Sequence, residues 1–151
     1  PVRETDMSIA SLKGVLKIFG ETELTDEERT QLAQEVMLMV LARATAADSN
    51  IKNIEIDTVR EIINKHTGVD FEPSEIRVAA NSVLFEKAPL QKYVASASRK
   101  LALAERVDIS LALAEVIRSD DRISSREIGF FNQIADGLQL SPADLVGLVE
   151  G

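Results

Sequence analysis

Apolar residues recur along most of the chain at spacings of three and four positions, and strict alternation of apolar and polar residues is nearly absent. This spacing is the period of an amphipathic helix, so the pattern predicts an all-α protein. Residues that start and stop helices divide the pattern into seven or eight short helices with short connections. The predicted segments are residues 7–20, 25–48, 53–66, 71–86, 89–103, 109–119, 125–138 and 141–150. We therefore predict a compact helical bundle.

Several of these helices begin or end at a recognisable residue. Thr25 and Glu28 have the pattern of a capping box, in which each side chain accepts a hydrogen bond from the other residue's backbone N–H. Pro73 stands in a first helical turn, where its missing N–H costs nothing, and Gly68 ends the helix before it. The break between the fifth and sixth helices, placed at residues 104–108, has no such signal. The first predicted helix has one apolar face, formed by Ile9, Leu12, Leu16 and Phe19.

The two halves of the chain match when the sequence is shifted by 72 residues. Each half contains three features in the same order, and the shift aligns them. They are an apolar helix, the pattern D-x-x-I-x-x-x-E and a second, amphipathic helix. The pairs are Leu41 and Leu113, Asp48 and Asp120, Ile51 and Ile123, Glu55 and Glu127, and Ile62 and Ile134. We predict from this match that the protein consists of two related helix-loop-helix halves.

The second copy of the pattern lies in the stretch SDDRISSREIGFF, residues 119–131, and suits a turn between two helices. Ser124 and Glu127 have the spacing of a capping box, and Ile123, just before the cap, can pack on the helix as a hydrophobic staple. Asp120 suits a turn because an aspartate side chain bonds its own backbone. Every residue of this copy therefore has a purely structural interpretation.

The first copy favours a functional interpretation. Lys52 occupies its cap position, so Glu55 has no Ser or Thr with which to form a capping box. Hard cations such as calcium, magnesium and manganese prefer carboxylate oxygens, so two such motifs that lie close together would form a divalent-metal site. This site is not an EF-hand, because the twelfth residue counted from Asp120 is Phe131 and not Glu. The candidate ligands are Asp48, Glu55, Asp120 and Glu127.

Composition narrows the class of function. The chain carries 17 basic and 25 acidic residues and a net charge of −8, which disfavours binding to nucleic acid or to an anionic membrane surface. No apolar run approaches the ~20 residues that span a bilayer, and the first residues lack a signal-peptide pattern. The absence of cysteine excludes disulfides and thiolate zinc sites and fits a reducing compartment. We therefore expect a cytoplasmic protein with no nucleic-acid partner and no membrane insertion.

Residues for catalysis are scarce. The single histidine, His66, is predicted at the end of the third helix, where a histidine is more often a cap or a surface group than a ligand or a catalyst. Tyr93 is predicted to lie in the core or at its rim. The chain contains no Gly-rich phosphate loop and no Gly-x-Ser-x-Gly motif. We predict no catalytic residues and no cofactor other than a divalent cation.

The stretch ALAEVIRSDDRISSREIGFFNQIADGLQLSPADL resembles the signature of the tellurite-resistance TerB family, A-x-A-D-G-x-I-x-x-x-E followed by a helix and a leucine-rich turn. LARATAADSNIKNIEIDTVREIINKHTG resembles the other copy, although Ser49 and Asp121 stand where Gly is common. The resemblance implies one TerB-like helical domain over residues 1–151, with about seven helices and internal pseudo-symmetry. It also implies an association with tellurite resistance and a divalent-metal site at the acidic residues of the two motifs.

Three functional hypotheses follow. The first is a non-enzymatic helical module that binds calcium, magnesium, manganese or zinc and acts with protein partners in a stress or tellurite-resistance response. The second is a protein–protein interaction module in which the acidic motifs only cap helices. The third, and least favoured, is a hydrolase that uses a metal-bound water, for which no second base or nucleophile is in view. The sequence specifies no oligomeric state.

Overall fold

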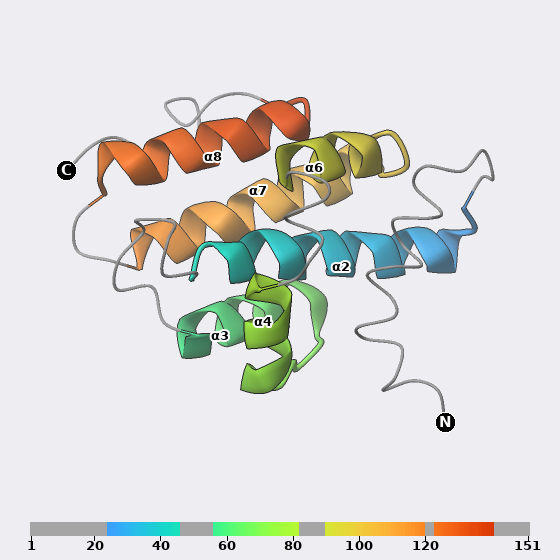
Figure 1. Ribbon diagram of the computed structural model, residues 1–151. Coiled ribbons are helices and arrows are strands. Elements are labelled where there is room, and N and C mark those ends of the chain that lie inside the picture. Colours follow the sequence, from blue (N-terminus) through green and yellow to red (C-terminus); the bar gives the residue numbers. More distant parts are fainter. Residues whose placement is uncertain (1–23, 46–55, 82–89, 120–122, 141–151) are drawn as a thin grey trace.

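The computed structural model describes residues 24–45, 56–81, 90–119 and 123–140 (Figure 1). These ranges contain six helices and no strand, which confirms the all-α prediction. The helices are α2 (Asp26–Arg43), α3 (Ile56–Thr67), α4 (Pro73–Ala80), α6 (Leu90–Ser98), α7 (Leu103–Arg118) and α8 (Ser125–Gly137). The helices predicted at residues 7–20 and 141–150 lie outside the described residues, so the total of seven or eight stays a prediction.

Two long helices, α2 and α7, lie side by side through the middle of the bundle (Figure 1). Helices α6 and α8 pack against each other on one side of this pair, and α3 and α4 pack against each other on the opposite side. Helix α2 contacts helices of both layers, and α7 contacts both α3 and α8. The connections that carry the two acidic motifs both follow the central helices.

Helix α2 is buried on all sides over part of its length, which agrees with its central position. Every residue from 35 to 42 is buried, although only one stripe of an ordinary surface helix is. At its start Thr25 Oγ1 accepts a hydrogen bond from the Glu28 N–H at 3.1 Å, and Glu28 Oε1 accepts one from the Thr25 N–H at 3.0 Å. The predicted capping box is therefore confirmed.

The predicted ends of three helices are wrong, because α2, α4 and α6 end at Arg43, Ala80 and Ser98 and not at residues 48, 86 and 103. Other boundaries follow their sequence signals. Helix α3 ends before Gly68, whose φ of 77° is a left-handed conformation that favours glycine. Pro73 is the first residue of α4, as predicted. The break predicted at residues 104–108 is wrong, because α7 already begins at Leu103. Its N-cap is Ala102, whose side chain cannot accept a capping hydrogen bond. The sequence therefore contains no helix-start signal at this position.

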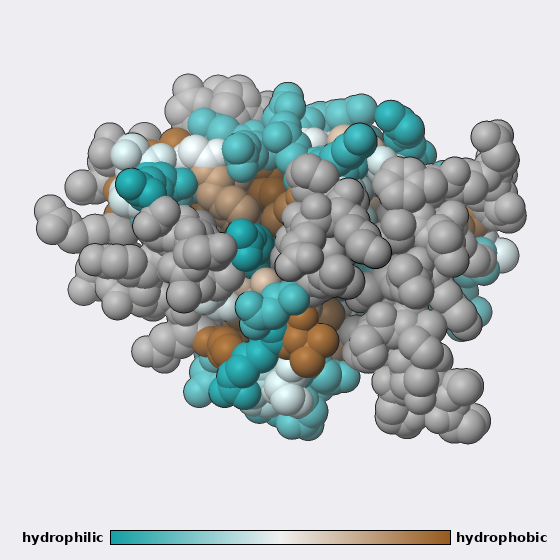
Figure 2. All heavy atoms as spheres, viewed as in Figure 1, coloured by the Kyte–Doolittle hydropathy of each residue, from teal (hydrophilic) through white to brown (hydrophobic). Residues whose placement is uncertain are grey.

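The surface is mixed in polarity. Among the coloured residues of Figure 2, hydrophobic residues lie between hydrophilic ones in both the upper and the lower part of the face. Val78 of α4 is 58% exposed. No helix in the described ranges is long and apolar enough to cross a lipid bilayer.

Candidate functional site

Glu127, one of the four predicted metal ligands, lies in the first turn of α8. Ser124 is the N-cap of this helix, and its Oγ accepts a hydrogen bond from the Glu127 N–H at 3.2 Å. Glu127 Oε1 in turn accepts a hydrogen bond from the Ser124 N–H at 2.7 Å. Ile123, just before the cap, packs against the core. The capping box predicted for this motif is therefore confirmed.

The capping box uses only one of the two carboxylate oxygens of Glu127. The residue is 2% exposed, and Oε2 has no hydrogen-bond partner within the described ranges. A buried acceptor without a donor costs about 1–3 kcal/mol, because it has lost its water without a replacement. Oε2 of Glu127 is therefore an acceptor that a cation or a donor can satisfy.

The other three predicted ligands, Asp48, Glu55 and Asp120, lie outside the described residues. The structure therefore neither brings them together with Glu127 nor separates them from it. Among the residues that it does describe, no group of three or more His, Asp and Glu side chains could hold a metal ion. Of the predicted metal site, the structure places Glu127 alone.

A second cluster of ionisable side chains joins α3 to α7. His66 Nδ1 lies 2.6 Å from Asp108 Oδ1, and His66 Nε2 lies 3.1 Å from Glu115 Oε2. Lys65 Nζ donates a hydrogen bond to the other oxygen of Glu115 at 3.0 Å. The His66 side chain is only 10% exposed, so the prediction of a surface or capping group is wrong. His66 is at the end of α3, as predicted, but it bridges two helices.

The contacts of this cluster lower the pKa of Glu115. Burial alone would raise its pKa, but the hydrogen bonds from Lys65 and His66, together with their charges, outweigh burial and lower the pKa. Asp108 and Glu115 contact the two ring nitrogens of His66 and join α7 to the end of α3.

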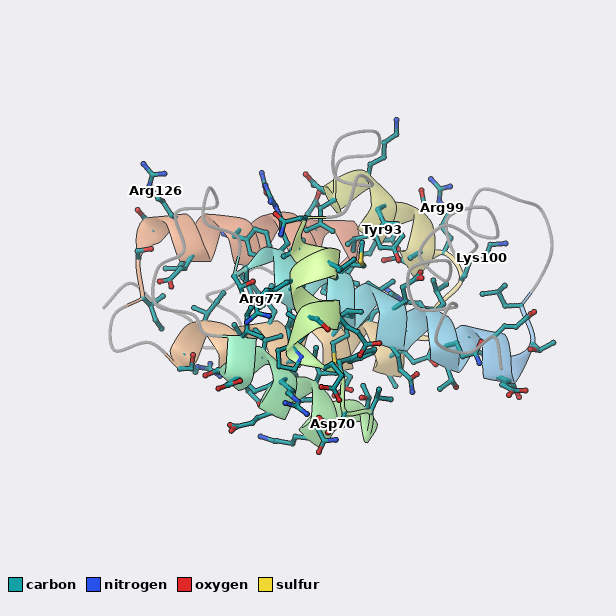
Figure 3. The ribbon with its side chains drawn as sticks, turned by 60° about the horizontal axis from the view of Figure 1, so that its bottom comes forward. Asp70, Arg77, Tyr93, Arg99, Lys100 and Arg126 are labelled. Carbon is teal, nitrogen blue, oxygen red and sulfur yellow. The ribbon has the colours of Figure 1, made fainter. Side chains whose placement is uncertain are left out.

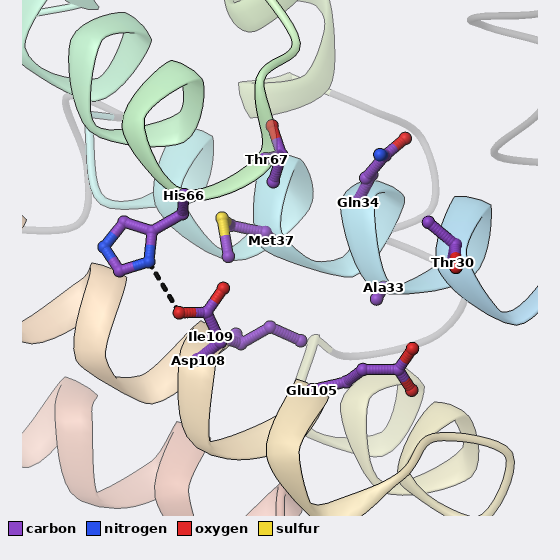
Figure 4. Close-up of a pocket in the computed structure, with 9 residues that line it drawn as sticks. All are labelled: Thr30, Ala33, Gln34, Met37, His66, Thr67, Glu105, Asp108 and Ile109. Atoms are coloured by element: carbon purple, nitrogen blue, oxygen red, sulfur yellow. Dashed lines mark hydrogen bonds and ion pairs between the residues drawn. The ribbon is translucent and has the colours of Figure 1, made fainter.

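A cleft of about 200 Å³ opens beside this cluster, between α2, α3 and α7 (Figure 4). Its lining residues are Thr30, Ala33, Gln34, Met37, His66, Thr67, Glu105, Asp108 and Ile109. Both nitrogens of the imidazole that lines it already face carboxylates, and the Thr67 hydroxyl donates to the Ile63 carbonyl. The imidazole and this hydroxyl are therefore already engaged in contacts within the fold.

A third ionisable pair lies inside the core. The Tyr93 hydroxyl on α6 donates a hydrogen bond of 2.8 Å to Glu35 Oε1 on α2. Burial raises the pKa of Glu35 to about 7, and the hydrogen bond from Tyr93 partly opposes this rise. Figure 3 shows Tyr93 directed into the bundle, whereas Lys100 and Arg126 reach outward. The core position predicted for Tyr93 is confirmed, since the residue is fully buried.

Sequence reasoning missed the acidic partners in both clusters. Asp108 and Glu115 are seven residues apart, which places them on one side of a helix, so their spacing was a usable signal. Glu35 stands among apolar residues in the central helix, and a charged residue in such a helix points to a buried pair. Nothing local in the sequence identifies Tyr93 as the partner of Glu35, or His66 as the partner of Asp108. The residues of each pair are more than 40 positions apart.

A comparison with protein-family models shows to which family the chain belongs. The model of tellurite resistance protein TerB matches residues 34–148. The chain belongs to the TerB family. The match covers most of α2, all of α3, α4, α6, α7 and α8, and both acidic motifs.

Membership of the TerB family confirms the resemblance that the two acidic motifs indicate. It associates the chain with tellurite resistance, and the family description names no catalysed reaction. No curated protein and no solved structure matched this TerB-family chain.

Proposed function

We propose that this TerB-family protein is a non-enzymatic helical module that binds a divalent cation in a cytoplasmic response to tellurite or metal stress. The observation that carries the proposal is the buried Oε2 of Glu127, which lacks a hydrogen-bond partner among the described residues. A bound cation would satisfy this oxygen and offset the cost of burying it. The capping box would meanwhile hold the same carboxylate in place through Oε1.

The remaining ligands of the proposed site come from the two acidic motifs. Asp120 belongs to the same motif as Glu127, and Asp48 and Glu55 are their counterparts in the first copy. Four carboxylates and no cysteine form an all-oxygen donor set, which suits calcium, magnesium or manganese better than zinc. Four clustered carboxylates without a cation would repel one another, so binding is expected to stabilise the fold.

The test is thermal unfolding with and without each cation. A cation that binds the folded state at 100 times its Kd stabilises it by about 2.7 kcal/mol. We expect manganese or calcium to raise the melting temperature of the wild type, Glu127→Gln to weaken the rise, and Asp48→Asn/Asp120→Asn to abolish it. No rise with calcium, magnesium, manganese or zinc would reject the proposal.

Glu75→Gln is the matched control for Glu127→Gln. Glu75 occupies the same position of a helix start in α4, where its Oε1 accepts a hydrogen bond from the Glu72 N–H at 2.8 Å. It lies outside both acidic motifs. Glu75→Gln should therefore disturb a cap to a similar extent and leave the cation-dependent rise unchanged.

A protein-interaction module is the second candidate. The observation that favours it is the capping box itself, because Ser124 and Glu127 are already explained as helix stabilisers. This candidate predicts that variants of the acidic motifs lower the melting temperature by the same amount with and without cations. The cation titration therefore separates the two candidates.

A further inference from the structure

Helix α7 carries an exposed apolar stripe. Leu103, Val107 and Leu111 follow one another every four residues, so their side chains line one side of the helix. They are 58%, 36% and 43% exposed, respectively. A row of large apolar side chains at the surface marks a contact face, because its burial would be favourable. We call these three residues the α7 stripe.

The sequence repeat indicates which element would cover the α7 stripe. The 72-residue shift pairs Val107 with Glu35 of α2, and Leu111 with Met39. On α2 both positions are buried, and Tyr93 of α6 is hydrogen-bonded to Glu35. Helix α6 directly precedes α7 in the chain and packs on α2. If the two halves are related as the sequence predicts, the helix directly before α2 covers the equivalent face of α7.

That helix is predicted at residues 7–20, which lie outside the described residues. Its apolar face matches the α7 stripe in length, since residues 9–19 of a helix span about 15 Å and the stripe about 12 Å. The residues of this face are Ile9, Leu12, Leu16 and Phe19.

The position of α2 brings this segment to the correct end of α7. Arg29 Nε lies 3.7 Å from Glu105 Oε1, so the first turns of α2 and α7 are neighbours. The chain that precedes α2 therefore reaches the described structure beside the start of α7, where Leu103 begins the stripe. A helix whose last residues lie there can follow the stripe only by running antiparallel to α7.

We propose that residues 7–20 form an amphipathic helix that docks antiparallel on the α7 stripe of the same chain. The apolar residues then meet in register. The pairs are Phe19 with Leu103, Leu16 with Val107 and Leu12 with Leu111.

Charge supports the antiparallel orientation. Residues 7–20 include Lys13 and Lys17 and no acidic residue, in a chain of net charge −8. Each lysine follows a residue of the apolar face by one position, as Asp108 follows Val107 on α7. When two helices face each other through their apolar residues, the residues one position further along each helix lie on the same side of the interface only if the helices run antiparallel. The Asp108 side chain is 42% exposed, so it is accessible to the lysines.

Disulfide trapping tests the proposal, because the chain has no cysteine of its own. In the full chain, Leu16→Cys/Val107→Cys is expected to form a disulfide within the monomer, identified by mass spectrometry after size-exclusion chromatography. The matched control is Ser11→Cys/Val107→Cys, because Ser11 lies opposite the apolar face. The control should oxidise about tenfold more slowly or less, since a disulfide needs Cα atoms within about 7 Å.

The outcomes of the trapping experiment are distinct. Equal rates for the two pairs, or no disulfide in either, overturn the proposal. A disulfide that forms only between two molecules also overturns it, and assigns the α7 stripe to a second copy of the chain.

Hydrogen exchange provides a second test in a single variant. Leu111→Asp places a charge in the α7 stripe at a residue that is 43% exposed, so the core keeps its packing. We expect amide exchange of residues 7–20 to become about tenfold faster or more, with α3 and α4 unchanged. Unchanged exchange in residues 7–20 would overturn the proposal even if the cysteine variants failed to fold.

Discussion

The Tyr93 hydroxyl donates a 2.8 Å hydrogen bond to the Glu35 carboxyl group, and this contact joins α6 to α2 inside the core. Glu35 is 5% exposed, and Tyr93 is fully buried. Burial raises the pKa of Tyr93 well above its ordinary value, and the charge of Glu35 adds to this rise. Tyr93 therefore stays a neutral donor, and Glu35 is the partner that changes charge near neutral pH.

The first prediction is that Glu35 makes the fold less stable as the pH rises from about 4.5 to about 7. The pKa of Glu35 is raised from 4.5 to about 7 in the folded protein, so over this interval the folded state holds a proton that the unfolded chain has released. The stabilisation is complete below the unfolded pKa and is lost as the pH rises through the folded one. Its size is about 3 kcal/mol, at about 1.4 kcal/mol for each pKa unit.

Glu35→Gln isolates this contribution. The amide stays neutral and can still accept the Tyr93 hydrogen bond, so the variant should match the wild type at about pH 4 and exceed its stability by about 3 kcal/mol at about pH 8. Urea unfolding across this range measures the difference. Glu27→Gln, at an exposed position of the same helix, should follow the wild-type curve. Parallel curves for wild type and Glu35→Gln would contradict the prediction.

The second prediction concerns the donor of the same hydrogen bond. Tyr93→Phe should destabilise the protein by about 1–3 kcal/mol, because it leaves the buried carboxyl without its donor. The Tyr93 hydrogen bond lowers the pKa of Glu35, so its removal should move the pH-dependent loss of stability to higher pH. In a Glu35→Gln background the same substitution should cost stability without any shift along the pH axis. A shift in that background would show that another group titrates.

The third prediction concerns the bridge between α3 and α7. The pKa of Glu115 is lowered because the hydrogen bonds of Lys65 and His66 outweigh burial, so this residue stabilises the fold above its unfolded pKa and loses that contribution as the pH falls through the folded one. His66→Phe should raise the pKa of Glu115, as measured by NMR titration of its carboxyl carbon. Lys65→Met should raise it as well. An unchanged Glu115 pKa in both variants would contradict the assignment of these partners.

The fourth prediction compares two glycines. Gly68 has a φ of 77°, and a methyl group there would meet nothing within 4 Å, so Gly68→Ala should cost about 1 kcal/mol through the backbone alone. Gly129 is inside α8 and exposed, and it also has nothing within 4 Å. Gly129→Ala should therefore stabilise the protein by about 0.5–1 kcal/mol. Thermal unfolding measures both, and equal effects of the two substitutions would argue against the left-handed conformation at Gly68.

Local sequence patterns were sufficient for most of the fold. The helical period predicted an all-α chain, and the box at Thr25 and Glu28 and the one at Ser124 and Glu127 were found where the sequence placed them. These features depend on residues three or four positions apart, so the sequence contains all that they require. The start of α7 was missed because Ala102 offers no side-chain cap.

The candidate site was predictable only in part. The acidic motif led to Glu127 and to its role in the cap, but the burial of its second oxygen comes from packing against the rest of the chain. The full set of four carboxylates stays a prediction, because Asp48, Glu55 and Asp120 lie outside the described residues.

The sequence by itself determined the all-α class, the capping boxes at Thr25 and Ser124, and the family, since each of these depends on short-range patterns. Only the tertiary structure decided which ionisable groups become partners. His66 meets Asp108 from 42 residues away, and Tyr93 meets Glu35 from 58 residues away. The charge of a buried group depends on the loss of water and on the donors around it, and both are supplied by residues that are neighbours only after the helices have packed.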